Sequence, residues 1–276
     1  MIIKKNKVIV SGATGFIGRH LIPILLDNGY NVIAVGRNIK KAQTFKWFKN
    51  VKFVAFDMND KNEYKNLDGA NGLIHLAWQG LQNYDSLIHT EKNSPNSYRF
   101  IKSLVKLGIK QILVSGSCAE YGFKSGAISS NSETYPVSVY AKAKNDLRKK
   151  LTILSKKYPF DLQWARIFYL FGEGQNEKSL FSQLEKAINN NDKEFKMSGG
   201  EQLRDYLPVE EVAKQIFDLY HKNKNGIHNI CSGQPISIKK LVNNHLKKRN
   251  SRININFGFF PYDDNEPMEF WGIKNN

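Results

Sequence analysis

The chain has 276 residues, which is enough for one large α/β domain carrying a smaller lobe. Hydrophobic residues make up 41% and aromatic residues 12%, so the chain can build a substantial core and is not disordered throughout. The net charge is +16, but the lysines are spread along the whole chain without a basic arm interleaved with aromatics, which argues against nucleic-acid binding.

The first half of the chain alternates strand-like and helix-like segments, which predicts a doubly wound parallel sheet. Short runs rich in β-branched residues predict strands at Lys7–Ser11, Asn31–Val35, Lys52–Phe56, Leu73–Ala77, Gln111–Ser115 and Asp161–Arg166. Apolar residues at three- and four-residue spacing predict helices at Phe16–Asp27, within Ser86–Leu107, and at Val137–Lys157. The fold class is therefore α/β.

After Arg166 the alternation is looser, and this part is predicted to form a small carboxy-terminal substrate lobe. Helices are expected at Lys178–Asn190, Val209–Lys222 and Ile238–Lys248, and strands at Gly226–Cys231 and Arg252–Phe257. We expect the lobe to span residues 167–276, with some of its segments returning to the large sheet.

A glycine motif, Gly12-Ala-Thr-Gly15-Phe-Ile-Gly18, follows the first strand directly and opens a helix. Glycines at this spacing allow a tight turn, close approach of the backbone to a pyrophosphate, and close packing of helix on strand. The helix amino terminus then offers free N–H groups to the phosphates. The motif predicts that residues 1–166 form a Rossmann-type, dinucleotide-binding domain.

The end of the second strand, Val35-Gly36-Arg37-Asn38, indicates which dinucleotide is bound. An acidic residue there would hold the ribose hydroxyls of NAD, whereas an arginine accommodates the additional phosphate of NADP. Arg37 occupies this place and no carboxylate follows until Asp57. The sequence therefore predicts NADP as the cofactor, with Arg19 as a second cation near it.

Tyr140 and Lys144 form a pair four residues apart on the helix that follows the fifth strand. This spacing places the phenol and the ammonium on one face of the helix. We expect the lysine cation to lower the pKa of the phenol, so that Tyr140 exchanges a proton near neutral pH. Alone, such a pair is common by chance and more often belongs to a solvated helix face.

Small polar residues, Ser115-Gly116-Ser117-Cys118, lie at the carboxyl end of the fifth strand. Ligands of open α/β sheets bind at that edge, and a hydroxyl there can hold a carbonyl group in line for reaction. Residues of this kind are also what an ordinary turn uses.

Together these motifs resemble the extended short-chain dehydrogenases/reductases that modify nucleotide sugars. The resemblance includes His75-Leu76-Ala77, Glu133-Thr-Tyr-Pro136, Arg204-Asp205 and Asn229-Ile-Cys-Ser-Gly233. It implies that the catalytic residues are Ser117, Tyr140 and Lys144. It also implies that the cofactor is bound by Gly12, Thr14, Gly15, Phe16, Ile17, Gly18, Arg19, Arg37, Asp57, Met58, Leu76, Ala77, Tyr140, Lys144 and Phe168. The substrate-binding residues implied are Ser117, Cys118, Tyr169 and Arg204, the last on the sugar-nucleotide diphosphate.

Departures from the family pattern narrow the expected activity. The acid–base pair of the sugar-nucleotide dehydratases is replaced by Cys118 and Ala119, so water elimination lacks its acid and base. The stretch around Cys118 and the segment Glu266–Gly272 are most similar to bacterial 4-keto-6-deoxyhexose reductases, such as the CDP-abequose and CDP-paratose synthases of surface-polysaccharide (O-antigen) pathways. The resemblance implies NADPH-dependent reduction of the 4-keto group of a nucleoside-diphosphate-4-keto-6-deoxyhexose.

Two other functions remain open at this point. One is an NAD-dependent nucleotide-sugar 4-epimerase, which Arg37 argues against. The other is a non-catalytic NADP-sensing regulator, for which Ser117, Tyr140 and Lys144 would all be unnecessary. Family habit further implies a homodimer.

Other sequence features bear on ligands and location. Only Cys118 and Cys231 occur, far apart, and the six histidines form no metal-binding pair, so neither a disulfide framework nor a metal site is expected. No apolar run of transmembrane length and no signal peptide precede the first strand, which favours a cytoplasmic enzyme with no membrane partner.

Overall fold

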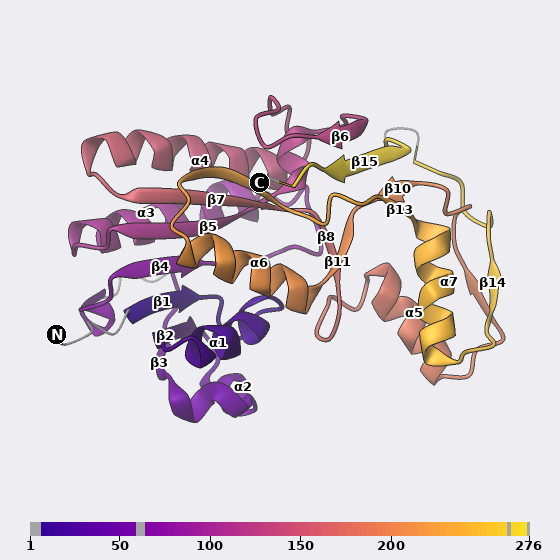
Figure 1. Cartoon of the computed structure of the whole chain (residues 1–276), viewed down its shortest axis with the longest axis horizontal. Coiled ribbons are helices and arrows are strands. Elements are labelled where there is room, and N and C mark those ends of the chain that lie inside the picture. Colours follow the sequence, from indigo (N-terminus) through magenta and orange to yellow (C-terminus); the bar gives the residue numbers. More distant parts are fainter. Residues whose placement is uncertain (1–6, 59–63, 264–265, 275–276) are drawn as a thin grey trace.

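The computed structural model describes residues 7–58, 64–263 and 266–274, and its centre is a seven-stranded parallel sheet (Figure 1). In spatial order the strands are β12 (Gly226–Ile230), β7 (Asp161–Ile167), β5 (Gln111–Ser117), β4 (Gly72–His75), β1 (Lys7–Ser11), β2 (Asn31–Gly36) and β3 (Lys52–Ala55). The strand order reverses direction at β1, as in doubly wound sheets. This arrangement confirms the predicted Rossmann-type α/β fold.

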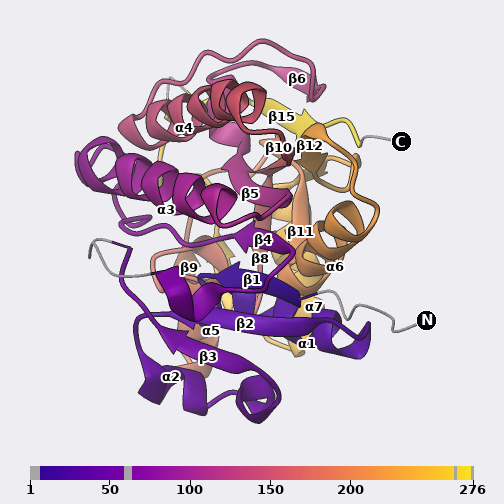
Figure 2. The ribbon, with the colours of Figure 1, turned by 90° about the vertical axis from the view of Figure 1, so that its left-hand side faces the viewer.

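Helices cover both faces of this sheet (Figure 2). One face carries α1 (Gly18–Asp27) and α6 (Val209–His221), whose buried Leu21, Leu25 and Ile216 belong to one apolar core. The other face carries α3 (Ser94–Lys106) and α4 (Val139–Lys157). Because both faces are covered, the central strands are apolar on both sides and read as continuous β-branched runs.

Some helices begin at other residues than the sequence predicted, because the residues before them form turns rather than regular α-helix. The first helix begins at Gly18 rather than Phe16, because Phe16 and Ile17 belong to the glycine turn. Helix α3 begins at Ser94 with Pro95 in its first turn, and a π-helical turn, η3 (His89–Asn93), precedes it. Two short 3₁₀ turns, η1 (Lys46–Asn50) and η2 (Tyr64–Leu67), and helix α2 (Ile39–Gln43) flank β3.

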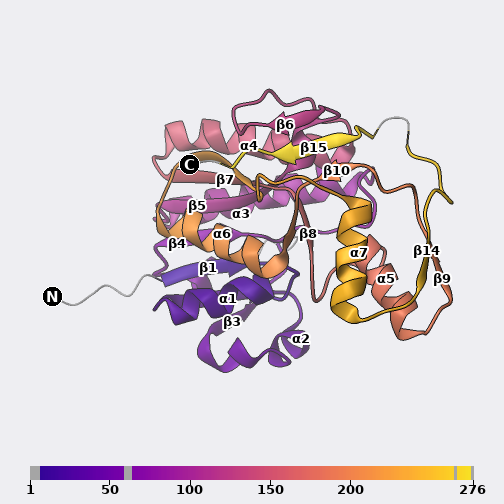
Figure 3. The ribbon, with the colours of Figure 1, turned by 45° about the vertical axis from the view of Figure 1, so that its right-hand side comes forward.

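A smaller lobe lies beyond the carboxyl ends of the parallel strands (Figures 1 and 3). It contains α5 (Leu180–Asn189), α7 (Ile238–Arg249) and the strand pair β9 (Glu194–Lys196) and β14 (Asn254–Asn256). Leu184, Met197 and Val242 form its apolar centre. Strand β14 replaces the longer strand expected at Arg252–Phe257, and β9 was not predicted.

Short strands join the lobe to the large sheet. A four-stranded sheet pairs β13 (Ile236–Ser237), β10 (Leu203–Arg204), β15 (Glu269–Gly272) and β6 (Gly126–Ile128), and β8 (Tyr169–Phe171) pairs with β11 (Tyr206–Pro208). Segment Gly226–Ile230 lies in the large sheet beside β7, so this part of the second half returns to it. The division of the chain at residue 166 stays a prediction. In the described part of the chain, no helix combines the length and apolarity needed to cross a bilayer.

Candidate active site

A cavity of about 980 Å³ lies at the carboxyl ends of the parallel strands and is bounded on its far side by residues of the lobe. Its volume is typical of a cavity for a large ligand. The predicted site residues that line it are Gly12, Thr14, Gly15, Phe16, Ile17, Gly18, Arg37, Asp57, Met58, Leu76, Ala77, Ser117, Cys118, Tyr140, Lys144, Phe168 and Tyr169. Folding therefore gathers residues spread over 158 positions, from Gly12 to Tyr169, around one space.

The glycine turn has the tight geometry that the motif predicts. Gly12 has a φ of +75°, and a Cβ placed there would lie 2.8 Å from the backbone nitrogen of Ala77. A Cβ at Gly18 would collide with the carbonyl oxygen of Gly12. Phe16 and Ile17 line the cavity, and their backbone N–H groups donate to no group in the described part of the chain. These donors at a helix amino terminus fit the pyrophosphate of a dinucleotide.

The end of the cavity beside β2 carries two cationic side chains. Arg37 follows β2 directly, and Lys41 lies one turn along α2, where its backbone N–H donates to the capping side chain of Asn38 over 2.9 Å. Both side chains line the cavity, with Asp57 and Met58 after β3. A guanidinium and an ammonium here fit a phosphate at the adenosine end of a dinucleotide.

Two predicted site residues do not line the cavity. The guanidinium of Arg19 donates to the carbonyl of Gly174 over 3.3 Å and lies over the ring of Phe45. Arg204 is almost fully buried and pairs with Glu266 at 2.6 Å. Each guanidinium thus already has partners within the protein, and the ligand contacts predicted for both stay predictions.

Ser117, Tyr140 and Lys144 converge beside the glycine turn. Ser117 ends β5, and Tyr140 and Lys144 lie one turn apart near the start of α4. The Ser117 side chain lies near the Tyr140 phenol and acts to lower the pKa of that phenol. The ammonium of Lys144 donates to the carbonyl of Ser115 over 2.7 Å and lies 6.0 Å from the centroid of the Tyr140 ring. The arrangement provides a hydroxyl pair and an amine on one wall of the cavity.

The pKa of Tyr140 departs from the prediction made for it. Burial raises this pKa above its ordinary value, and the neighbouring Tyr84 adds to the increase. Burial also lowers the pKa of Lys144 to about 7. The expected lowering of the phenol pKa was wrong for this structure, because the ammonium faces Ser115 and the indole of Trp78 rather than the phenol oxygen. Tyr140 is therefore a protonated phenol at neutral pH.

Aromatic side chains enclose the catalytic pair, and the motifs did not predict them. The Lys144 ammonium lies 3.9 Å from the centroid of the Trp78 ring. Tyr84 stacks on Tyr140 with 4.8 Å between centroids, and the ring of His89 meets the edge of Tyr140. Trp78 follows His75-Leu76-Ala77 immediately, and that position was the one available sequence signal.

Two buried groups in the site are inactive as acids or bases near neutral pH. Burial, followed by the charge of Glu120, raises the pKa of the Cys118 thiol to about 12. Burial, followed by the charge of Lys144, lowers the pKa of His75 to about 3, and this ring bonds to the hydroxyls of Ser11 and Ser97. Cys118 is thus a packed neutral thiol.

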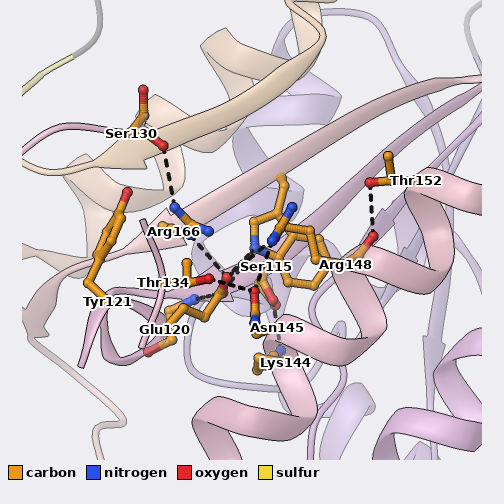
Figure 4. Close-up of polar contacts among 12 residues, drawn as sticks. Ser115, Glu120, Tyr121, Ser130, Thr134, Lys144, Asn145, Arg148, Thr152 and Arg166 are labelled. Carbon is orange, nitrogen blue, oxygen red and sulfur yellow. Dashed lines mark hydrogen bonds and ion pairs between the residues drawn. The ribbon is translucent and has the colours of Figure 1, made fainter. Parts of the chain in front are cut away.

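Figure 4 shows a buried ionic network around Glu120 and Arg166, and Glu120 accepts from the backbone N–H of Ser117. Glu120 belongs to the 3₁₀ turn η4 (Cys118–Tyr121), and its carboxylate pairs with Arg166 at 3.0 Å. Tyr121 donates to Asn229 over 2.7 Å, and the guanidinium of Arg166 lies over the Tyr121 ring. Within the described residues, no group of three His, Cys, Asp or Glu side chains is arranged to hold a metal ion.

Comparisons with known proteins agree with this geometry. The model of the NAD dependent epimerase/dehydratase family matches residues 8–231. A dTDP-6-deoxy-L-talose 4-dehydrogenase (NAD(+)) from Aggregatibacter actinomycetemcomitans is 31% identical over 97% of this chain and 99% of its own length. The CDP-abequose synthase of Salmonella typhimurium is 26% identical over 100% of this chain and 92% of its own length. These matches confirm the family resemblance read from the sequence.

Solved structures support the fold. The UDP-N-acetylglucosamine 4-epimerase of Methanobrevibacter ruminantium superposes with a TM-score of 0.84 at 23% identity, covering 99% of this chain and 90% of its own. A dTDP-glucose 4,6-dehydratase of Streptomyces venezuelae superposes with a TM-score of 0.82 at 19% identity, covering 97% and 88%.

Proposed function

This chain belongs to the NAD dependent epimerase/dehydratase family, and we propose that it reduces the 4-keto group of a nucleoside-diphosphate-4-keto-6-deoxyhexose with NADPH. The observation that carries the proposal is the Tyr140 phenol, which burial keeps protonated, beside Ser117 in the wall of the cavity. The names of two relatives support the substrate class, since one is a deoxyhexose 4-dehydrogenase and the other a CDP-abequose synthase.

The cofactor is NADPH in this proposal. The free N–H groups of Phe16 and Ile17 bind its pyrophosphate, and Arg37 and Lys41 bind the additional phosphate. When bound, the dinucleotide supplies the hydride that the ketone carbon receives. The relative from Aggregatibacter is named for NAD(+), so the choice of dinucleotide is the first thing to measure.

The chain's own residues handle the proton and the position of the ketone. The hydroxyls of Ser117 and Tyr140 donate hydrogen bonds to the ketone oxygen, which holds the carbonyl in line. Tyr140 then gives its proton to that oxygen as the alcohol forms. Its raised pKa keeps the phenol protonated at neutral pH, and a protonated donor is what the reduction direction requires. Lys144 donates to the carbonyl of Ser115 and so ties the end of β5 to the helix that carries Tyr140.

Elimination of water is disfavoured by the residues next to Ser117. The two positions that follow it hold Cys118 and Ala119, and the thiol stays neutral because its pKa is about 12. The site therefore offers one proton donor for a ketone and no carboxylate at these positions. We further propose, on family habit, a cytoplasmic homodimer that serves surface-polysaccharide synthesis.

The test is oxidation of NADPH, followed at 340 nm, with CDP-, dTDP- and GDP-linked 4-keto-6-deoxyhexoses, and repeated with NADH. We expect consumption with one nucleotide and a preference for NADPH. Turnover of a nucleotide sugar without added dinucleotide, by protein that carries NAD through purification, would instead establish the 4-epimerase. If the protein binds the dinucleotide but turns over no sugar, the result would favour the non-catalytic NADP-sensing regulator.

A further inference from the structure

The carboxylate of Glu120 is fully buried and contacts the backbone of Ser117 directly. One of its oxygens accepts from the N–H of Ser117 and from the indole N–H of Trp164, both over 2.9 Å. The other accepts from Arg166 over 3.0 Å. A buried carboxylate is costly unless it is paired and hydrogen-bonded, and these donors satisfy it. Glu120 therefore has one fixed position, directly behind the end of β5.

Gly116 shows how closely this network approaches the strand. A Cβ at Gly116 would lie 2.6 Å from the carboxylate of Glu120 and would collide with the indole nitrogen of Trp164. Any larger residue would push the carboxylate and the indole away from β5. The Ser-Gly-Ser sequence thus leaves room for the carboxylate to reach the Ser117 N–H.

The same network reaches helix α4, which carries the other two catalytic residues (Figure 4). Arg148 of α4 lies 3.9 Å from the Glu120 carboxylate. Its guanidinium donates over 2.9 Å to the side chain of Asn145, which also accepts from Thr134. Asn145 is buried and follows Lys144 in sequence. Glu120 thus lies between the strand that ends at Ser117 and the helix that holds Tyr140 and Lys144.

We propose that Glu120 is a positioning residue, which fixes Ser117 at the end of β5 and holds it in register with Tyr140 on α4. The inference rests on the proposed ketone reduction, because it assigns Glu120 a role in that reaction. Glu120 does not line the cavity and acts through the Ser117 backbone. Misplacing the Ser117 hydroxyl should lower turnover by roughly 10- to 100-fold while leaving dinucleotide binding nearly unchanged.

The central test is a double-mutant cycle on kcat with wild type, Glu120→Ala, Ser117→Ala and the double variant. If Glu120 acts through Ser117, Glu120→Ala lowers kcat in the wild-type background and has little further effect in the Ser117→Ala background. Glu120→Gln retains an oxygen for the Ser117 N–H and should recover part of the loss. The matched control is Glu194→Gln, at the exposed start of β9, which should leave kcat unchanged. Equal losses in both backgrounds would overturn the proposal.

Glu120→Ala leaves Arg166 buried without its carboxylate, which can prevent folding. The double variant Glu120→Ala/Arg166→Met removes both charges. It replaces Glu120→Ala in the double-mutant cycle with Ser117→Ala. Dinucleotide binding reports folding in each variant. If neither variant binds the dinucleotide, the carboxylate serves the fold as a whole and the proposal is overturned.

Hydrogen exchange at the Ser117 amide separates this proposal from the proposed function, because it needs no substrate. The loss of the carboxylate acceptor should speed exchange of that amide by roughly tenfold or more in the folded variants. A wild type that reduces no ketone, with faster exchange in the variants, would refute the reductase and retain the positioning role. An active wild type with unchanged exchange would refute the positioning role alone.

Discussion

The ring of Tyr84 lies nearly parallel to the ring of Tyr140, with 4.8 Å between their centroids and 21° between their planes. The backbone joins them as well, since the Tyr140 N–H donates to the Tyr84 carbonyl over 2.8 Å. Tyr84 belongs to the loop between β4 and η3, and its side chain is half exposed and lines the cavity. The loop thus covers the catalytic phenol and contributes to its burial.

Replacing Tyr84 should separate the effect of its ring from that of its hydroxyl. Tyr84→Phe keeps the stack and should retain most of kcat/KM. Tyr84→Ala removes a stacked pair worth about 0.5–1.5 kcal/mol and should lower kcat/KM up to roughly tenfold. Tyr135→Ala, at another exposed tyrosine, is the control and should have no effect. Equal losses in the Phe and Ala variants would show that the ring does not matter.

Lys144 predicts a specific dependence of stability on pH. Its pKa is lowered by burial to about 7 in the folded protein and returns to about 10.5 on unfolding. Between these values the unfolded chain binds more protons, so this group makes the free energy of unfolding rise as pH increases from about 7 to 10.5. Below pH 7 the amine is charged in both the folded and the unfolded protein, so the free energy of unfolding no longer changes with pH through this group. The fold then carries the full cost of the buried charge.

Urea unfolding at pH 7 and pH 9 tests this expectation. Wild type should gain stability relative to Lys144→Met as the pH rises, whereas Lys142→Met, on the exposed face of α4, should follow wild type. A constant difference between wild type and Lys144→Met at the two pH values would show that Lys144 titrates normally.

Arg37 should determine the preference for NADPH. Removing a charge-assisted hydrogen bond to phosphate costs about 1.5–3 kcal/mol, so Arg37→Ala should raise the KM for NADPH by roughly 10- to 100-fold. The KM for NADH should change little. Lys40→Ala removes an exposed cation that does not line the cavity, and it should leave both values unchanged. An equal increase in the KM values for NADPH and NADH would mean that Arg37 does not bind the additional phosphate of NADPH.

Glu266 holds the guanidinium of Arg204 that the family resemblance assigns to the substrate diphosphate. Its carboxylate lines the cavity and would repel an anionic substrate. Glu266→Gln should therefore lower the KM for the nucleotide sugar several-fold, with little change in kcat. Glu269→Gln, at the exposed start of β15, is the control. A higher KM in Glu266→Gln would show that the ion pair builds the substrate site.

The sequence predicted the features that depend on local pattern. The glycine turn, the strands of the seven-stranded parallel sheet and the Tyr140–Lys144 spacing each lie within a short segment. The periodicity or motif of such a segment can be recognised from the sequence alone. Strands β10 and β13 have two residues each, too few for any alternation to show. They form only because β15 and the lobe bring their partners together.

The environment of the catalytic residues depends on tertiary packing instead. Helical spacing places Lys144 and Tyr140 on one face, but it does not reveal that Trp78 covers the ammonium or that burial outweighs its charge. The Ser117–Glu120 contact is a capping box, a local pattern with three-residue spacing, but the bond from Glu120 to Trp164 spans 44 positions, so no local pattern reveals that the carboxylate is buried.

The most direct test of the account is the single-turnover reduction of a nucleotide-linked 4-keto-6-deoxyhexose by wild type and Tyr140→Phe, with dinucleotide affinity measured in parallel. Loss of the proton donor should lower the rate by roughly 10²- to 10⁴-fold and leave dinucleotide affinity within a few-fold of wild type. A Tyr140→Phe variant that reduces the ketone at nearly the wild-type rate would contradict the proposed mechanism.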